Sequence, residues 1–408
     1  MSFTESIFDE EDSEGFTLWN RDFEGQGSPF HSQQIIIDGR LTKKSNSKHF
    51  ERKYFALTDQ YLYYKTDAYD LSVRGWMHLD WVRVEYIKKL ISSPKSNSTE
   101  MTLYGFRFLR NMKFTEIFTE DQQVFCDWAG HLKRMLIQTN FDDIYSVDKT
   151  IGRGSFSEVY QATENATGRR YAVKYLTKVN LNSQYKGRLA IKNEIQIMKS
   201  CKGNPCVVAL LEVHELPDTV YIVMELLEGD SLHTYVLKGG YGDQEIVFIM
   251  RNILETLIFL KNNKIIHRDI KPDNIVFKSR NFKLNAKKLE PNLPKFIDFG
   301  LSTYTDKGFY IYRRVGSLGF TAPEIINLRP GPVTYDYMTD IYTAGLIFCF
   351  LKTGNSPFYH GDEDTILQRN KDNQINWNLY DGKMEPGALE FFKRMVVTNP
   401  VDRPTAEL

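Results

Sequence analysis

The sequence predicts an α+β chain with more than one domain, and three observations support this fold class. Its 408 residues exceed the ~100 to 200 residues of a usual domain. Residues 34–138 contain short strand-like runs followed by one amphipathic helix. Residues 145–408 carry glycines, a lysine, carboxylates and an amide in an order that suits phosphate chemistry. We therefore expect an acidic flexible tail at 1–33, a strand-rich domain at 34–138, a short linker at 139–144 and a larger domain at 145–408.

Charge is spread unevenly along the first third of the chain. Residues 1–33 hold one basic and eight acidic residues, whereas residues 34–140 hold 17 basic and 12 acidic ones. A stretch with many acidic and few periodic apolar residues is typical of a flexible tail. A tail that only keeps the protein in solution is one interpretation; a tail that folds back onto the basic loop of the next domain is the other.

Composition and the length of apolar runs suit a cytoplasmic protein. Four cysteines in no regular framework fit a reducing compartment. The longest apolar runs, such as Gly345 to Leu351, are far shorter than a membrane span of ~20 residues. We expect no transmembrane segment and no nucleic-acid partner, and peripheral contact with membranes stays an alternative.

The strand-rich domain is predicted from alternating runs separated by turn-rich pieces. A helix should follow, because Thr119 and Gln122 have capping-box spacing and the apolar residues from Val124 to Leu136 fall on one face. A β-barrel closed by a C-terminal helix that contains Trp128 resembles a pleckstrin homology domain. The expected strands are Ile35 to Lys43, Lys53 to Leu57, Tyr61 to Lys65, Trp76 to Val84, Met101 to Leu109 and Phe114 to Phe118.

That resemblance implies a phosphoinositide or other anion site in the loop between the first two strands, where basic side chains match clustered phosphate oxygens. Glu51 stands at one of the key basic positions and would repel phosphate. Specific lipid binding, weak attraction to an anionic membrane and an intramolecular protein contact therefore all stay open. The candidate anion-binding residues are Lys43, Lys44, Lys48, Arg52 and Lys53.

A glycine-rich loop opens the second domain. Gly152, Gly154 and Ser155 lie in a strand-turn-strand segment from Ile151 to Val159, where glycines let the backbone close over phosphates. Ala172 and Lys174 follow on a later strand, and Lys174 is placed to hold the α- and β-phosphates of ATP. Glu194, in a helical run from Arg188 to Ser200, is placed to orient that lysine.

The proton- and metal-handling residues come later in the chain. Asp269 is expected to accept the proton of a substrate hydroxyl. Asn274 and Asp298 offer an amide and a carboxylate oxygen, which suit Mg²⁺ bound together with ATP phosphates.

From about Tyr145 onwards the chain resembles a eukaryotic protein kinase domain, most like the calcium/calmodulin-dependent group. The resemblance rests on the segments Ile151 to Val159, His267 to Asn274, Asp298 to Gly300 and Ala322 to Glu324. It implies a two-lobed fold, ATP and Mg²⁺ as cofactors, protein substrates and, from Lys271 and Ser317, serine/threonine specificity. It also implies that Lys271 neutralises the charge that develops during transfer. It also implies a buried ion pair between Glu324 and Arg403. The residues expected to surround the nucleotide are Ile151, Val159, Ala172, Met224, Glu225, Leu227 and Val276.

Departures from the family pattern concern regulation and specificity. Arg313 occupies the usual activation-segment phosphosite, so control by loop phosphorylation is in doubt. Ser231 replaces the glutamate of relatives that prefer basic substrates, with Asp230 and Asp273 as substitutes that would leave a weakened preference for arginine upstream of the target. The sequence ends at Leu408, before the closing helix that the resemblance implies, which leaves open whether this end is truncated. Calcium control does not follow from the group resemblance.

Three classes of function stay in play. An active serine/threonine kinase is favoured because every residue for nucleotide, metal and proton handling is present. A pseudokinase scaffold would normally lack one of Lys174, Asp269, Asn274 or Asp298. An adaptor with a vestigial kinase half would transfer no phosphate even with Mg²⁺ and ATP.

Overall fold

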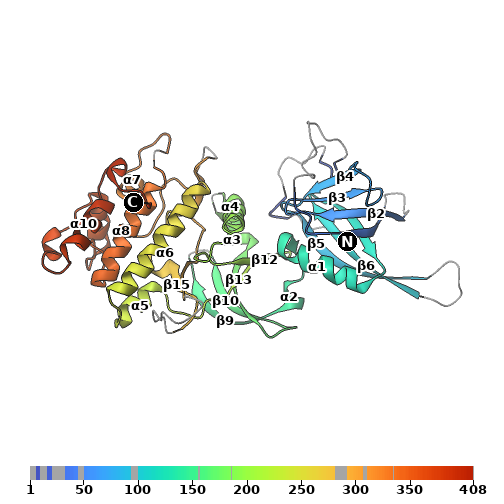
Figure 1. Cartoon of the computed structure of the whole chain (residues 1–408), viewed down its shortest axis with the longest axis horizontal. Helices are drawn as coiled ribbons and strands as arrows, with labels where there is room; N and C mark the ends of the chain where they lie inside the picture. Colours follow the sequence, from blue (N-terminus) through green and yellow to red (C-terminus); the bar gives the residue numbers. More distant parts are fainter. Residues whose placement is uncertain are drawn as a thin grey trace. The chain divides into compact units, whose positions relative to one another are not determined.

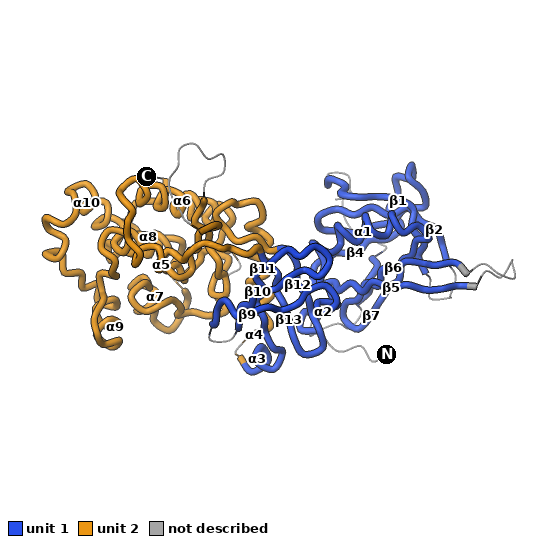
Figure 2. Tube along the Cα trace, turned by 90° about the horizontal axis from the view of Figure 1, so that it is seen from below, with its two compact units in different colours: residues 1–183, 211–224 blue, residues 184–210, 225–408 orange. Residues whose placement is uncertain are grey.

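The computed structural model describes residues 6–9, 16–20, 33–44, 50–92, 100–154, 157–184, 186–280, 292–306, 310–333 and 335–407. They form two compact units, coloured separately in Figure 2. Unit one comprises residues 1–183 and 211–224, and unit two comprises residues 184–210 and 225–408.

Seven antiparallel strands and one helix form the first part of unit one, which we call the N-terminal module. The strands follow the order β4-β3-β2-β1-β7-β6-β5. No pairing joins β4 to β5 among the described residues, so the sheet is open there and the expected closed barrel is not formed. The strands are β1 (Ile37–Lys44), β2 (Phe50–Leu57), β3 (Tyr61–Lys65), β4 (Gly75–His78), β5 (Arg83–Ser92), β6 (Glu100–Arg110) and β7 (Lys113–Thr119).

Helix α1 (Gln122–Met135) covers the core of the module. Trp128 and Leu132 are buried against the sheet, as the predicted apolar face requires. The helix begins at a different cap from the expected one, because the side chain of Asp121 accepts hydrogen bonds from the amides of Gln123 and Val124. Thr119 instead ends β7.

One predicted strand is two strands in the structure. The run from Trp76 to Val84 is broken between β4 and β5, where Trp81 has a φ of 60°. A bulky residue rarely adopts positive φ, and this conformation cannot continue a strand. Alternating apolar residues on both sides of the break hid it in the sequence pattern.

The described parts of the N-terminal stretch are packed, so the structure differs there from the expected flexible tail. Ile7, Phe8 and Leu18 are buried. Asn20 pairs with Trp76 in an isolated antiparallel bridge. These few apolar residues anchor an otherwise acidic stretch, and its average composition hides them.

A second group of strands completes unit one. Strand β8 (Ile137–Gln138) lies parallel to both β5 and β12, so it joins the module to the strands that follow. Helix α2 (Phe141–Ile144) occupies the expected linker, and its Phe141 stacks on Tyr221 with centroids 3.8 Å apart. The remaining elements are β9 (Tyr145–Arg153), β10 (Glu158–Glu164), β11 (Arg170–Thr177), α3 (Lys178–Ser183), β12 (Leu210–Glu215) and β13 (Thr219–Glu225).

Unit two is mainly helical, and its helices α6 and α8 pack against each other (Figure 1). Residues 338–351 of α8 are all buried, which suits a helix with apolar residues on every side. A Cβ at Gly345 would lie 2.8 Å from the Cβ of Met395, so glycine permits the close approach of α8 and α10. The helices are α4 (Gly187–Ser200), α5 (Leu232–Lys238), α6 (Asp243–Asn262), α7 (Pro323–Ile326), α8 (Met338–Thr353), α9 (Glu363–Lys371) and α10 (Pro386–Met395).

In the described ranges, no helix combines the length and the hydrophobicity needed to cross a membrane.

Short elements connect the helices of unit two. The short strands are β14 (Ile265–Ile266), β15 (Ile275–Phe277), β16 (Pro294–Phe296) and β17 (Thr303–Tyr304), and the 3₁₀ turns are η2 (Pro272–Asn274), η3 (Trp377–Leu379) and η4 (Pro400–Asp402).

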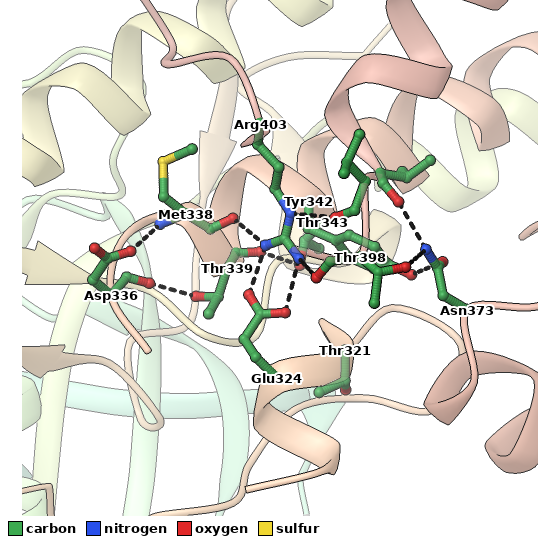
Figure 3. Close-up of polar contacts among 12 residues, drawn as sticks. Thr321, Glu324, Asp336, Met338, Thr339, Tyr342, Thr343, Asn373, Thr398 and Arg403 are labelled. Atoms are coloured by element: carbon green, nitrogen blue, oxygen red, sulfur yellow. Dashed lines mark hydrogen bonds and ion pairs between the residues drawn. The ribbon is translucent and has the colours of Figure 1, made fainter. Parts of the chain in front are cut away.

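The predicted ion pair between Glu324 and Arg403 is confirmed (Figure 3). Two bonds of 2.6 and 2.8 Å join the guanidinium to the carboxylate. Three backbone carbonyls accept the other guanidinium N–H groups, at Met338, Val397 and Thr398. All five N–H donors of this buried arginine are therefore satisfied.

Candidate functional site

Strand register in unit one sets the glycine-rich loop beside the predicted phosphate-binding lysine. Val159 on β10 stands opposite Gly152 on β9 and opposite Lys174 on β11. Residues directly opposite each other in a sheet share a face, and Ala172 shares it because it lies two residues before Lys174. The sheet thus gathers four of the predicted nucleotide-binding residues on one face.

The loop itself is partly described. The amide of Gly154 donates to the carbonyl of Ser157 at 2.8 Å, which closes the turn between β9 and β10. Ile151 is exposed at the edge of this turn. Ser155, also predicted for the nucleotide site, lies outside the described residues.

The segment after β13 runs along β15 within unit two. The amide of Gly229 donates to the carbonyl of Phe277 at 3.1 Å, and a Cβ at Gly229 would lie 2.4 Å from that oxygen. This close approach requires glycine. Leu227 lies in the same segment, and Val276 lies on β15.

Two more predicted nucleotide-binding residues stand where β13 ends. Glu225 accepts hydrogen bonds from the amide of Ala209 at 2.7 Å and from Lys295 at 2.6 Å, which fixes the start of the segment that follows. Met224, the last residue of unit one, is buried. The two hydrogen bonds of Glu225 therefore hold the end of β13 in place.

Asp340 on α8 anchors the loop that carries Asp269. Its carboxylate accepts hydrogen bonds from the amides of His267 and Arg268, at 2.7 and 2.9 Å. Burial raises the pKa of Asp340 to about 6, although both amides favour its charged form. Burial also lowers the pKa of His267 to about 4, so its imidazole is neutral at pH 7.

Three donors converge on the carboxylate of Asp269. The Ser317 hydroxyl lies 2.7 Å from Oδ1, and the Asn274 amide Nδ2 lies 3.0 Å from Oδ2. The Lys271 Nζ is 3.3 Å from Oδ2 and 2.9 Å from the Ser317 Oγ. The structure therefore brings together Asp269, Lys271, Asn274 and Ser317 from two separate segments.

Asn274 and Asp298 fit a hard divalent cation. The Asn274 Nδ2 donates to Asp269, so its Oδ1 is the amide's remaining acceptor. The carbonyl of Asn274 accepts the amide of Ile297, which places Asp298 beside it at the end of the β15–β16 pair. The Asp298 Oδ1 accepts the amide of Gly300 at 3.0 Å. An amide and a carboxylate oxygen are ligands that Mg²⁺ accepts.

Lys174 and Glu194 lie in different units. Lys174 is on β11 of unit one, and Glu194 is a buried residue of α4 in unit two. Within unit two, α4 is tied to the segment that follows Asp298, because Asn193 Nδ2 donates to the carbonyl of Ser302 at 2.8 Å. The pairing of Lys174 with Glu194 stays a prediction.

Arg268 is held by groups from three other segments of unit two. Its guanidinium donates to the carbonyls of Leu301 and Tyr312 and to the hydroxyl of Tyr335, at 2.7, 2.6 and 2.9 Å. It also lies over the ring of Tyr310. Hydrogen bonds within the chain thus tie the arginine that precedes Asp269 to Leu301, shortly after Asp298, and to Tyr312 and Tyr335 further along the chain.

Two of the predicted anion-binding lysines are paired with carboxylates. Lys44 lies 3.1 Å from Glu116, and Lys53 lies 2.9 Å from Glu51. Glu51, expected to repel phosphate, therefore neutralises one of the cations that would have to bind it.

The other three anion-binding candidates differ from one another. The Lys43 ammonium lies over the rings of Trp19 and Tyr64, 4.4 and 4.3 Å from their centroids. Arg52 is exposed, and Lys48 lies outside the described residues. Among the described candidates, two are therefore paired with carboxylates and one lies over aromatic rings.

Glu116, which the sequence pattern does not single out, forms ion pairs with Lys44, Lys89 and Arg107. Burial would raise its pKa, but hydrogen bonds from Arg107, Lys89 and Lys44 lower it to about 2. Its carboxylate is therefore charged throughout the neutral range and competes with any phosphate for those cations. An acidic residue inside a predicted apolar strand was the available signal, because buried charges need partners.

Tyr335 was missed as well. Its hydroxyl accepts from Arg268 and donates to the carbonyl of Arg313, at 2.9 and 2.8 Å. A tyrosine in a segment without periodicity carries no local signal. Asp230, proposed as a substitute for an acidic specificity residue, pairs with Lys238 at 2.6 Å.

Comparison with known proteins agrees with this geometry. Residues 145–408 match the family model described as "Protein kinase domain". Similar proteins include "Calcium-dependent protein kinase 8" of Oryza sativa subsp. japonica, 32% identical over 64% of this chain and 47% of that protein. "Myosin light chain kinase A" of Dictyostelium discoideum is 29% identical over 66% of this chain and 86% of that protein. The chain spans about half the length of the plant relatives it matches.

Proposed function

Because the chain belongs to the protein kinase domain family over residues 145–408, we propose that it is an ATP-dependent protein serine/threonine kinase. The observation that carries this proposal is the convergence of Ser317, Lys271 and Asn274 on Asp269. A carboxylate held by three donors is oriented before any substrate arrives, and such preorganisation favours transfer.

The proposed reaction moves the γ-phosphoryl group of ATP to a protein hydroxyl. Asp269 orients the hydroxyl and takes up its proton as the new O–P bond forms and the bond to ADP breaks. Lys271, 3.3 Å from Asp269, offsets the charge on the transferring group. Asn274 and Asp298 would hold Mg²⁺, which neutralises phosphate charge when bound. Lys174 and the amides of the glycine-rich loop would position the phosphates.

Serine/threonine specificity is supported by the contact between Lys271 and Ser317. The Lys271 Nζ donates to the Ser317 Oγ at 2.9 Å, and both groups contact the Asp269 carboxylate. The short side chain of serine or threonine brings its hydroxyl to the buried Asp269 carboxylate, whereas the phenol of tyrosine stands on a longer side chain.

Arg268 supports activity without phosphorylation of the chain. Its hydrogen bonds to Leu301, Tyr312 and Tyr335 already hold it in place.

The test uses phosphatase-treated protein, with the phosphatase removed, and three peptides that differ only in a serine, threonine or tyrosine acceptor. We expect Mg²⁺-dependent transfer of label from ATP to serine and threonine, and little to tyrosine. No transfer to any peptide or generic protein substrate would favour a pseudokinase scaffold or an adaptor. Activity that appears only after phosphorylation of the chain would contradict the proposed role of Arg268.

We also propose that the N-terminal module resembles a pleckstrin homology domain and acts within the chain rather than on specific lipids. Two observations support this. Lys44 and Lys53 are paired with Glu116 and Glu51. Lys133 of the module pairs with Glu164 and Glu212 of the strands that follow, at 3.1 and 2.9 Å.

Vesicle binding tests this second proposal. We expect the full chain to bind vesicles containing a phosphoinositide no better than vesicles of equal charge made with phosphatidylserine, because the paired lysines offer no specific phosphate site. Glu116→Gln should raise binding to both vesicle types, since it frees lysines from a buried carboxylate. Clear preference of the unaltered chain for a phosphoinositide would contradict the proposal.

A further inference from the structure

Residues 6–9 are held by groups from two places in unit one. Ile7 and Phe8 are 1% and 0% exposed, although they belong to an acidic stretch of the chain. Their partners come from the N-terminal module and from the elements β12 and α3. A tetrapeptide buried in this way is a bound segment rather than a solvated tail.

Glu215, the last residue of β12, is the main partner of this segment. Its carboxylate accepts the hydroxyl of Ser6 and, at 2.8 Å, the amide of Ile7. Two cations face the same carboxylate: Lys178 Nζ at 2.9 Å and Arg83 Nε at 3.8 Å. The carboxylate is 1% exposed, so these contacts form in a low-dielectric setting where each is stronger than in water.

Asp9 is held by the turn between β6 and β7. Its Oδ1 accepts the amide of Asn111 at 2.7 Å, and its Oδ2 lies 3.9 Å from Arg83 Nη2. Asn111 and Met112 have positive φ, as the two central residues of a tight hairpin turn do. The first amide of such a turn lies outside the strand ladder, and here it is directed at the Asp9 carboxylate.

Phe8 fills the apolar part of the site. Its ring stacks on that of Trp81 with centroids 5.2 Å apart and planes 4° apart. Trp81 is the residue whose positive φ breaks β4 from β5. The unusual backbone therefore presents the indole to Phe8, and strained positions of this kind often mark binding sites.

The charges of the site favour an acidic ligand. Lys178 and Arg83 carry two positive charges, and Glu215 supplies one negative charge. Asp9 of the segment supplies a second, so these four groups are balanced only when the segment is bound. We propose that this is a peptide-binding site that takes an apolar, aromatic and acidic sequence, with Ser6–Asp9 as its ligand, and that it pins the N-terminal module to β12 and α3.

Hydrogen exchange of the full chain tests the site. The amide of Asn111 reports occupancy because it donates to Asp9, and the amide of Val173 in β11 serves as a remote reference. Phe8→Ala and, separately, Asp9→Asn should speed exchange at Asn111 by roughly ten- to hundredfold, since each removes a contact that holds the segment. Exchange at Val173 should stay unchanged. Tyr69→Ala, at an aromatic side chain that is 92% exposed, is the matched control and should leave both amides unchanged.

A peptide added in trans separates binding from a general loss of structure. A synthetic peptide of residues 1–15 should restore slow exchange at Asn111 in the Phe8→Ala chain. The same peptide with phosphoserine at position 6 should fail, because its phosphate would face the buried Glu215 carboxylate. Unchanged exchange at Asn111 in both variants would overturn the proposal, as would equal acceleration at Asn111 and Val173, a peptide without effect, or equal rescue by the phosphorylated peptide.

Discussion

Asp269→Asn is expected to lower turnover about 10²- to 10⁴-fold while ATP binding stays nearly intact. An amide cannot take up the proton of the substrate hydroxyl. It also offers one oxygen where Ser317, Lys271 and Asn274 now meet two, so one of these donors loses its acceptor. The measurements are kcat with a serine peptide and the affinity for a fluorescent ATP analogue.

Asp381→Asn is the matched control for this substitution. Asp381 is an exposed carboxylate between η3 and α10, and its loss should change neither value. Retained turnover in Asp269→Asn would remove Asp269 from the reaction. Lost ATP affinity with turnover intact at saturating ATP would assign it to nucleotide binding instead.

Glu324→Gln is expected to destabilise the protein by about 3–5 kcal/mol. The Arg403 side chain is 0% exposed, and the substitution leaves its charge buried without a counter-ion. Figure 3 shows how the carboxylate and guanidinium face each other. Urea unfolding, followed by circular dichroism, measures the change in the free energy of unfolding.

Two comparisons separate the buried pair from an ordinary surface pair. The double variant Glu324→Leu with Arg403→Met should cost less than the sum of its single variants, because no charge remains unpaired. Lys261→Met breaks the surface pair with Glu407, 2.8 Å apart, and should have little effect. Equal costs for Glu324→Gln and Lys261→Met would contradict the importance of burial.

The sequence predicted best the strands and helices whose pattern depends on residues close together in the chain. The run Tyr61–Lys65 is a strand with the predicted ends, and α4 begins one residue before the predicted Arg188. Alternation and helical periodicity depend on near neighbours, so a single sequence contains them.

Contacts between two particular residues in distant segments were predicted where a family motif named both partners. Glu324 and Arg403 were expected to pair, and Ser317 was expected beside Asp269. Glu116 and Tyr335 had no such motif, and their roles depend on strand pairing and loop packing that local pattern does not specify. Ile7 and Phe8 were overlooked because two apolar residues do not alter the average of an acidic stretch.

Whether this chain is a protein serine/threonine kinase is decided by the rate of label transfer from ATP to a serine peptide, measured for the full chain with and without Mg²⁺. We expect phosphoserine formation that requires Mg²⁺ and is lost in Asp269→Asn. Absence of phosphoserine at saturating ATP, Mg²⁺ and peptide, in a chain that still binds ATP, would contradict it.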